Sequence, residues 1–242
     1  MCGRFFLQRD PAGLARYFET TNATPNHRAS WNVAVTQDSL VVRRHPGSGE
    51  RHLDALRWGL VPSWAKDTKD AARLMNARAD GISEKPSFRD AFHKRRCLVA
   101  MDGFYEWRKG EGDTKQAYAV ALATGEPMAV AGLWEGWKQP DGTWLRTFTI
   151  ITTEANEKQA LVHQRMPVIL APEVWDAWLG AEPAEPEELL ELLLPCPAED
   201  LAIWPVDNRV GKVAENDARL LRRDPLAIPP PELDDAPPDL TG

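Results

Sequence analysis

The chain alternates short apolar runs with turn-forming residues along most of its length. The apolar runs are rich in Val, Ile, Leu and aromatic residues, and each has the length of one strand. Gly, Pro and Asp separate them, as in "ATGEP" and "QPDGTW". We therefore expect antiparallel sheets, with strands in the stretches "NVAV", "LVVRRH", "RHLDALRWGL", "CLVAMDGFYEW", "QAYAVAL", "MAVAGLWEGW" and "TFTIITTEA".

Three stretches carry the start and stop signals of helices. In "DPAGLARYFE", Asp10 can cap the helix and Pro11 can occupy its first position. The stretch "APEVWDAWLG" has the same proline near its start and ends on glycine, and "EPEELLELLL" is a third candidate. A few helices beside many strands predict an α+β fold.

The chain of 242 residues is long enough to bury a core of its own, and we expect one domain over residues 1–223. Residues 224–242 are rich in proline and acidic residues, which predicts a disordered tail. No run is long enough to span a membrane, and no secretion signal is present. Together with scattered cysteines that form no CxxC pair, this favours a cytoplasmic protein without a disulfide framework.

The net charge of −7 hides an asymmetry between the two halves of the chain. Residues 1–110 carry 19 Lys and Arg against 12 Asp and Glu, a net charge of +7, whereas residues 111–242 carry 10 against 24, a net charge of −14. A basic half on an acidic protein is compatible with a local phosphate-binding surface, although a solvated basic face is equally common.

Cys2 directly follows the initiator methionine, and methionine is commonly removed ahead of a small residue. Its removal would leave an α-amine and a thiol on one residue, with ordinary pKa values of about 8 and about 8.5. The amine can attack an aldehyde to form an imine, and the adjacent thiol can then close a five-membered ring. The alternative is that Cys2 is an ordinary small residue.

Three further stretches contain side chains suited to chemistry. Asn76 and Arg78 lie two residues apart in "MNARAD", so an extended backbone would point both to one side. Glu106 has aromatic neighbours that can raise its pKa, as proton transfer requires, unless it faces water. His163, near Arg165, has a side chain suited to proton transfer near neutrality, unless its role is structural.

Several classes of site lack support in the sequence. The five histidines show no paired metal-ligand spacing, and no P-loop, GxSxG or GxGxxG motif is present. We therefore expect no metal ion and no nucleotide cofactor.

Eight short motifs, in this order, resemble the SOS response-associated peptidase (SRAP) family over residues 2 to about 222: "MCGRF", "WNVA", "WGLVPSWA", "MNARAD", "CLVAMDGFYEW", "AGLWE", "IITTEAN" and "HQRMPVIL". The resemblance implies a barrel-like core of antiparallel sheets with a DNA-binding cleft. It also implies a monomeric sensor and shield of abasic sites in single-stranded DNA. Family members join the C1′ aldehyde of such a site to the residue that corresponds to Cys2, as a thiazolidine.

The resemblance also implies roles for individual residues. Asn76 would orient the Cys2 amine or the sugar, Glu106 would help to deprotonate the amine, and His163 would be the acid that helps to open the sugar ring. Trp64 would stack on a base near the lesion. The full set of expected DNA-binding residues is Arg4, Asn32, Trp64, Arg78, Thr152 and Arg165.

Two positions depart from the family pattern: Val35 replaces a usual proline, and Asp80 replaces a usual glutamate. The first puts a DNA contact of that loop in doubt, and the second can alter a supporting salt bridge. Two alternative functions remain open at this point. One is a cysteine peptidase with Cys2 as nucleophile and His163 as base, and the other is a noncovalent module that binds single strands.

Overall fold

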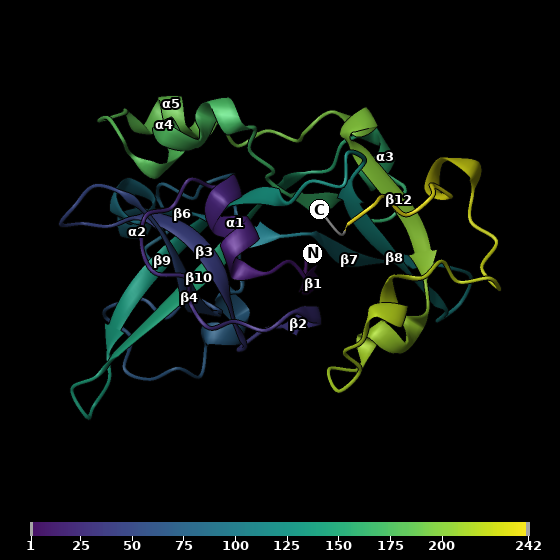
Figure 1. Cartoon of the computed structure of the whole chain (residues 1–242), viewed down its shortest axis with the longest axis horizontal. Coiled ribbons are helices and arrows are strands. Elements are labelled where there is room, and N and C mark those ends of the chain that lie inside the picture. Colours follow the sequence, from purple (N-terminus) through teal and green to yellow (C-terminus); the bar gives the residue numbers. More distant parts are fainter. Residues whose placement is uncertain (1, 241–242) are drawn as a thin grey trace.

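The computed structural model describes residues 2–240, in which twelve strands form two sheets (Figure 1). The strands are β1 (Arg4–Leu7), β2 (Ser30–Ala34), β3 (Asp38–Arg44), β4 (Arg51–Trp58), β5 (Asn76–Arg78), β6 (Arg96–Met101), β7 (Gly103–Lys109), β8 (Lys115–Leu122), β9 (Met128–Lys138), β10 (Trp144–Glu154), β11 (Arg165–Pro167) and β12 (Leu201–Val206). The fold is therefore mostly β.

The larger sheet closes into a barrel. Its strands pair in the order β10-β4-β3-β6-β9, and β9 pairs back with β10, so that this ring has no open edge. The barrel confirms the expected closed core, but two of its sheet's pairings are parallel, between β10 and β4 and between β10 and β5. Alternation of residues along a strand cannot reveal this, because parallel partners are joined by long crossovers rather than hairpins.

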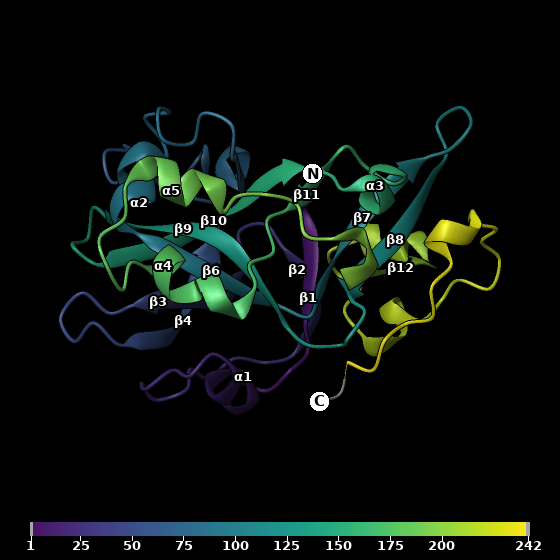
Figure 2. The same ribbon diagram turned by 90° about the horizontal axis from the view of Figure 1, so that it is seen from above.

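The smaller sheet is antiparallel throughout, in the order β12-β8-β7-β1-β2. Its strand β1 lies in the middle of the molecule, between the barrel and the outer strands β8 and β12 (Figure 2). Successive side chains of β1 point to opposite faces, and Phe5 packs into the barrel core while Phe6 packs into a second cluster with Tyr105 and Trp204. Because both faces of β1 are buried, its backbone has little freedom to move.

The helices are short and lie outside the sheets: α1 (Pro11–Tyr17), α2 (Arg89–Lys94), α3 (Glu157–Ala160), α4 (Trp175–Leu179) and α5 (Pro186–Glu191). Helices α1, α4 and α5 confirm the three predicted stretches. The Asp10 side chain caps α1, accepting hydrogen bonds from the backbone of Ala12 and Gly13, and Gly180 ends α4 with a left-handed φ of 77°. None of the described helices is long and apolar enough to cross a bilayer.

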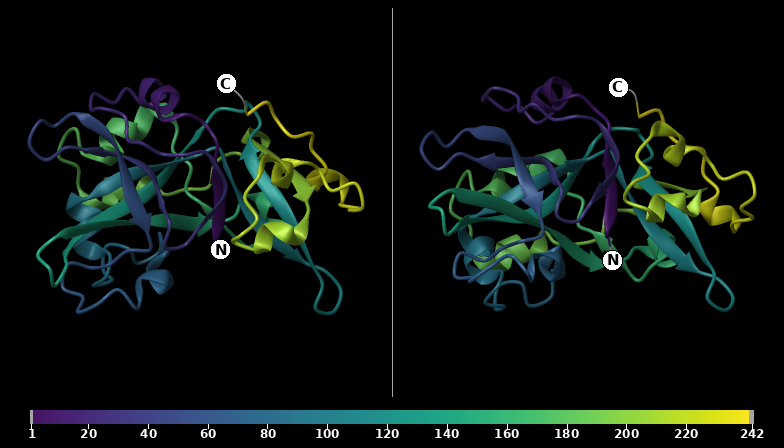
Figure 3. Two further views of the ribbon diagram at one scale, coloured as in Figure 1. Left: turned by 60° about the horizontal axis from the view of Figure 1, so that its bottom comes forward. Right: turned by 90° about the horizontal axis from the view of Figure 1, so that it is seen from below.

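Residues 224–240 pack against the domain, which differs from the disorder expected of the composition of residues 224–242 (Figure 3). Leu233 and Leu240 are buried. The Asp235 carboxylate accepts a hydrogen bond from Ile203 N at 2.6 Å and forms an ion pair with Lys158 at 2.7 Å. Two buried leucines and one paired acidic side chain therefore hold a segment whose other large apolar residues, Leu226 and Ile228, are exposed.

A matched pair of leucine variants tests this packing. Leu233→Ala should lower the free energy of unfolding by about 2–4 kcal/mol, because it removes a fully buried side chain. Leu226→Ala should change it by less than about 0.5 kcal/mol, because Leu226 is 88% exposed. Urea unfolding measures both, and equal effects of the two substitutions would contradict the packing.

Candidate functional site

Cys2 lies two residues before β1 and is 1% exposed. Asn76, at the start of β5, donates a hydrogen bond from Nδ2 to the Cys2 carbonyl at 2.8 Å. The Cys2 thiol donates a longer one to the carbonyl of Arg4 at 3.8 Å. The short strand β5 therefore ties the start of the chain to β10, with which it pairs. The extended backbone expected at Asn76 is confirmed.

Glu106 is on β7, next to the register pair Arg4 and Tyr105 that joins β1 to β7. It is 5% exposed, which rules out the alternative that it faces water. Burial raises the pKa of the Cys2 thiol, and the charge of Glu106 raises it further. Burial and the charge of Glu106 therefore both favour the protonated thiol.

The strands β5, β10 and β11 bring three more of the expected residues together. Thr152 on β10 pairs in register with Arg78 on β5 and with Pro167 on β11. Arg165 donates from Nη2 to the Thr152 carbonyl at 2.5 Å and to its hydroxyl at 3.2 Å. Thr152 is fully buried and accepts hydrogen bonds from Arg165. It therefore supports the Arg165 side chain and does not itself face an open surface, where the resemblance implies a DNA contact.

Asp80 connects the two arginines of this group. Its carboxylate pairs with Arg78 at 3.0 Å and with Arg165 at 3.3 Å. The hydrogen bond from Arg78 lowers the pKa of Asp80, so the carboxylate stays charged near neutrality. Asp80 thus still reaches both arginines, although it is one methylene shorter than the expected glutamate.

His163 precedes β11 and is half-buried. Its Nδ1 accepts a hydrogen bond from the backbone N–H of Arg165 at 3.0 Å. In the neutral ring this contact assigns the proton to Nε2, which can then donate it.

Trp64 is 64% exposed and borders a hollow of about 470 Å³. The loop that carries it is held by Trp137, whose Nε1 donates to the carbonyl of Ala65 at 2.7 Å. An exposed indole on an anchored loop is suited to stacking on a base. The other residues that line this hollow are Leu60, Val61, Pro62, Ala65, Lys66, Asp67, Asp70, Ala71, Arg73, Leu74 and Ser87.

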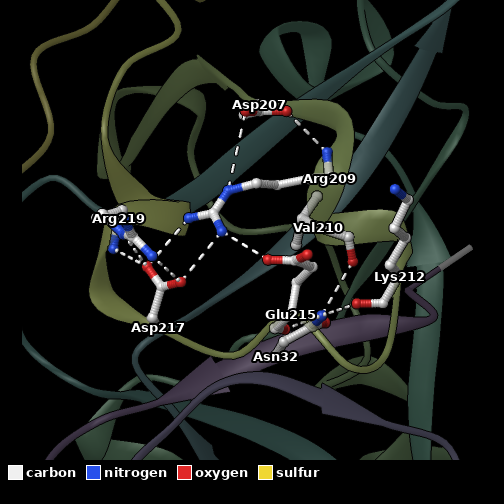
Figure 4. Close-up of polar contacts among 8 residues, drawn as sticks. All are labelled: Asn32, Asp207, Arg209, Val210, Lys212, Glu215, Asp217 and Arg219. Atoms are coloured by element: carbon white, nitrogen blue, oxygen red, sulfur yellow. Dashed lines mark hydrogen bonds and ion pairs between the residues drawn. The ribbon is translucent and has the colours of Figure 1, made fainter.

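The structure places Asn32 away from an open surface. Asn32 is 1% exposed, and its Nδ2 donates to the carbonyls of Val210 at 3.1 Å, Lys212 at 3.0 Å and Glu215 at 2.8 Å (Figure 4). Its amide group therefore fastens the segment 207–219, which follows β12, to β2. In this conformation it is a structural anchor, whereas the sequence predicts a DNA contact.

Arg4 also meets this segment. Its guanidinium donates to the carbonyl of Gly3 at 2.9 Å and to that of Gly211 at 3.4 Å. Burial lowers the pKa of Arg4. The anchored segment therefore contacts Arg4, the strand residue two positions after Cys2.

Within the segment, ion pairs surround Arg209 (Figure 4). Arg209 pairs with Glu215 at 2.7 Å and with Asp217 at 3.0 Å, and Arg219 pairs with Asp217 at 3.0 Å. Hydrogen bonds from Arg219 and Arg209 lower the pKa of Asp217. Sequence reasoning did not single out this segment, although its dense mixture of opposite charges in "DNRVGKVAENDAR" is a signal that was present.

Loss of the Asn32 amide should loosen this segment. Asn32→Ala leaves three carbonyls without their donor, and should lower the free energy of unfolding by about 1–3 kcal/mol. Backbone amides in residues 208–216 should exchange hydrogen faster. Lys212→Ala is the matched control, because only the backbone of Lys212 accepts from Asn32. Unchanged exchange in Asn32→Ala would contradict the anchoring role.

The thiol of Cys2 should become more reactive when Glu106 loses its charge. Glu106→Gln removes a negative charge that raises the Cys2 pKa, so the pH profile of Cys2 alkylation should move to lower pH. Peptide mass spectrometry after iodoacetamide treatment distinguishes Cys2 from Cys97 and Cys196. Glu111→Gln, on the exposed hairpin after β7, is the control and should leave the profile unchanged. A shift to higher pH in Glu106→Gln would contradict the charge effect.

Comparison with known proteins agrees with the motifs. The family model described as SOS response associated peptidase (SRAP) matches residues 1–213. The chain is 40% identical over 223 residues to abasic site processing protein YoqW of Bacillus subtilis, covering 91% of this chain and 99% of that protein. It is 32% identical over 233 residues to abasic site processing protein HMCES of Gallus gallus, covering 84% of this chain and 68% of that protein.

A crystal structure of a protein from Bacteroides thetaiotaomicron has a similar fold. The two structures superpose with a TM-score of 0.82 at 28% identity, over 92% of this chain and 100% of the other. A Bordetella bronchiseptica protein gives a TM-score of 0.72 at 25% identity, over 85% and 100%. Sequence and fold lead to one conclusion: the chain belongs to the SOS response-associated peptidase (SRAP) family.

Proposed function

We propose that the protein forms a covalent crosslink to abasic sites in single-stranded DNA through Cys2, once Met1 has been removed. The observation that carries the proposal is the set of residues around Cys2. Its carbonyl is held by Asn76, and the charge of Glu106 acts on its thiol. Relatives named abasic site processing proteins, at 40% and 32% identity, support the substrate class.

The reaction needs two bonds to one carbon. The free amine of Cys2 attacks C1′ of the open sugar, and the carbonyl oxygen leaves as water to give an imine. The thiol then adds to the same carbon, and its proton passes to the nitrogen. The product is a thiazolidine, and the overall change is the loss of one water. The amine attacks first and the thiol closes the ring, because the imine must form before the thiol can add to its carbon.

Three side chains assist these steps. Glu106 accepts a proton from the Cys2 ammonium group, which frees the lone pair of the amine. Asn76 holds the Cys2 backbone and so limits where the amine can point. The Nε2–H of His163 donates a proton during opening of the sugar ring.

Other residues of the site would bind the flanking DNA. Arg78 and Arg165 carry guanidinium groups suited to phosphate oxygens, and Asp80 fixes both of them. Trp64 would stack on a base beside the lesion. These contacts position the sugar and do not select a sequence.

The raised pKa of Cys2 disfavours a cysteine peptidase. Such an enzyme needs a thiolate at neutral pH, which a neighbouring cation or histidinium stabilises by lowering the thiol pKa. Here burial and the charge of Glu106 raise the pKa instead. A module that binds single strands noncovalently would differ from the proposed protein in one respect: its complex with DNA would not survive denaturant.

A single-stranded oligonucleotide with one abasic site tests the proposal. The wild type should give a shifted band that survives heat and denaturant, and Cys2→Ala should give none because both nucleophiles act from one residue. Cys196→Ala is the matched control and should keep the band, because Cys196 lies outside the site. Glu106→Gln should crosslink at least about tenfold more slowly, in keeping with the usual contribution of a general base.

Two results would contradict the proposal. A stable band in Cys2→Ala would exclude the aminothiol reaction. A stable band from protein that carries a peptide extension ahead of Cys2 would exclude the need for a free amine. Binding that never becomes resistant to denaturant would favour the noncovalent module.

A further inference from the structure

A basic hollow lies at the end of the barrel, far from Cys2. It is formed where the hairpin between β3 and β4, the end of α2 and the loop after α4 meet, on the side of the molecule away from β8 and β12 (Figures 1 and 2). Its volume is about 730 Å³. We call it the barrel-end hollow; the residues that line it include Arg44, His45, His93, Lys94, Arg95, Arg96, Trp134 and Glu182.

The charge of the barrel-end hollow is strongly positive and incompletely neutralised. Arg44 and Lys94 form no ion pair with any residue of the described range 2–240. Arg95 is paired with Glu135 at 2.7 Å, and Glu182 is the acidic residue in the lining. Two cations on separate elements therefore remain without an anionic partner.

Arg96 adds a buried positive charge behind them. Its guanidinium donates to the backbone carbonyls of Phe92 at 2.8 Å, His93 at 2.9 Å and Trp178 at 2.5 Å. No carboxylate contacts it within the described chain. The hydrogen bonds hold Arg96 in place but do not cancel its charge, so the positive potential in the hollow persists.

The wall also contains an aromatic ring. Trp134 is half-buried, and the guanidinium of Arg43 stacks on it with 4.6 Å to the ring centroid. Arg43 in turn pairs with Asp54 at 2.8 Å. Apolar walls beside fixed cations strengthen the attraction for an anion by limiting the access of water.

The hollow is separate from the Cys2 site but within reach of the same strand of DNA. Strand β3 begins at Asp38, which pairs with Arg57 near the end of β4, and it ends at Arg44 in the hollow. At that end of β4, Trp58 donates a hydrogen bond to the carbonyl of Met75, the residue before Asn76. Its seven residues span about 20 Å at about 3.3 Å per residue. That length corresponds to about six nucleotides at the duplex spacing of about 3.4 Å each, and to fewer in a more extended single strand.

We propose that the barrel-end hollow is a second phosphate-binding site, which binds the backbone of the single strand about six nucleotides from the lesion held at Cys2. This inference rests on the proposed function of the Cys2 site. Arg44 and Lys94 would contact phosphate oxygens, while Arg96 would supply fixed charge behind them. The site also gives a role to the basic half of the chain, residues 1–110. The four Lys and Arg residues that line the hollow all lie in that half: Arg44, Lys94, Arg95 and Arg96.

The test measures noncovalent binding to an undamaged oligonucleotide of about 20 nucleotides, long enough to reach both sites. Fluorescence anisotropy over a salt series gives the affinity and the slope of its logarithm against the logarithm of salt concentration. Arg44→Gln and Lys94→Gln should each reduce the slope by about 0.7, and the affinity by about fivefold at 0.1 M salt. Arg16→Gln is the matched control, because Arg16 is exposed on α1 and forms no ion pair with any residue from 2 to 240.

Loss of affinity in Arg44→Gln and Lys94→Gln with an unchanged slope in Arg16→Gln would support the site. The proposal would be overturned if all three variants had the same affinity and the same slope. It would also be overturned if substitution of Arg44 and Lys94 weakened the binding of deoxyadenosine monophosphate but left the binding of the oligonucleotide unchanged. Because the oligonucleotide has no abasic site, failure here is independent of the crosslinking test on Cys2.

Discussion

The hydrogen bond from Asn76 to the carbonyl of Cys2 links the start of the chain to the barrel. A chain terminus is ordinarily loose, because few contacts hold its first residues. Here β1 is an inner strand with side chains buried on both faces, and Asn76 binds the carbonyl of Cys2, two residues before the strand begins. If Cys2 reacts as we propose, these contacts limit the positions that it can adopt and so lower the entropic cost of bringing it to a substrate.

The electrostatics of the site follow from the same burial. Burial and the charge of Glu106 raise the pKa of the Cys2 thiol and so disfavour its thiolate form. A carboxylate in that place serves an ammonium group much better, since it attracts the cation and can take its proton. The surroundings of Cys2 therefore suit a reaction in which nitrogen attacks first and sulfur second.

Local signals in the sequence predicted most long elements. Strands such as β3, β9 and β10 have continuous apolar runs, and the caps of α1 and α4 were visible as Asp10 and Gly180. The strands β5 and β11 have three residues each, and their extended form depends on pairing with β10. The packing of the C-terminal segment likewise depends on contacts far along the chain, such as that of Asp235 with Ile203.

For the candidate site, as for the fold, the sequence indicated the residues in local motifs but not the contacts between distant parts of the chain. The motifs led us to predict Cys2, Asn76 and Glu106 as site residues; in the fold, Asn76 donates to the Cys2 carbonyl and the charge of Glu106 acts on the Cys2 thiol. Asn32 lies in the same motif set, but its amide holds three carbonyls of the segment 207–219. A sequence can indicate which residue types a reaction needs. It cannot tell a side chain that faces substrate from one that holds a loop, because that depends on neighbours distant in the chain.

The central claim is that one residue supplies both nucleophiles, and the mass of the modified N-terminal peptide tests it most directly. After reaction with abasic-site DNA and digestion by nuclease and protease, the adduct should lie on a peptide that begins at Cys2. Its mass should equal that of the peptide plus the sugar fragment, less one water. An adduct on any other residue, or on a peptide that still begins with Met1, would contradict the account.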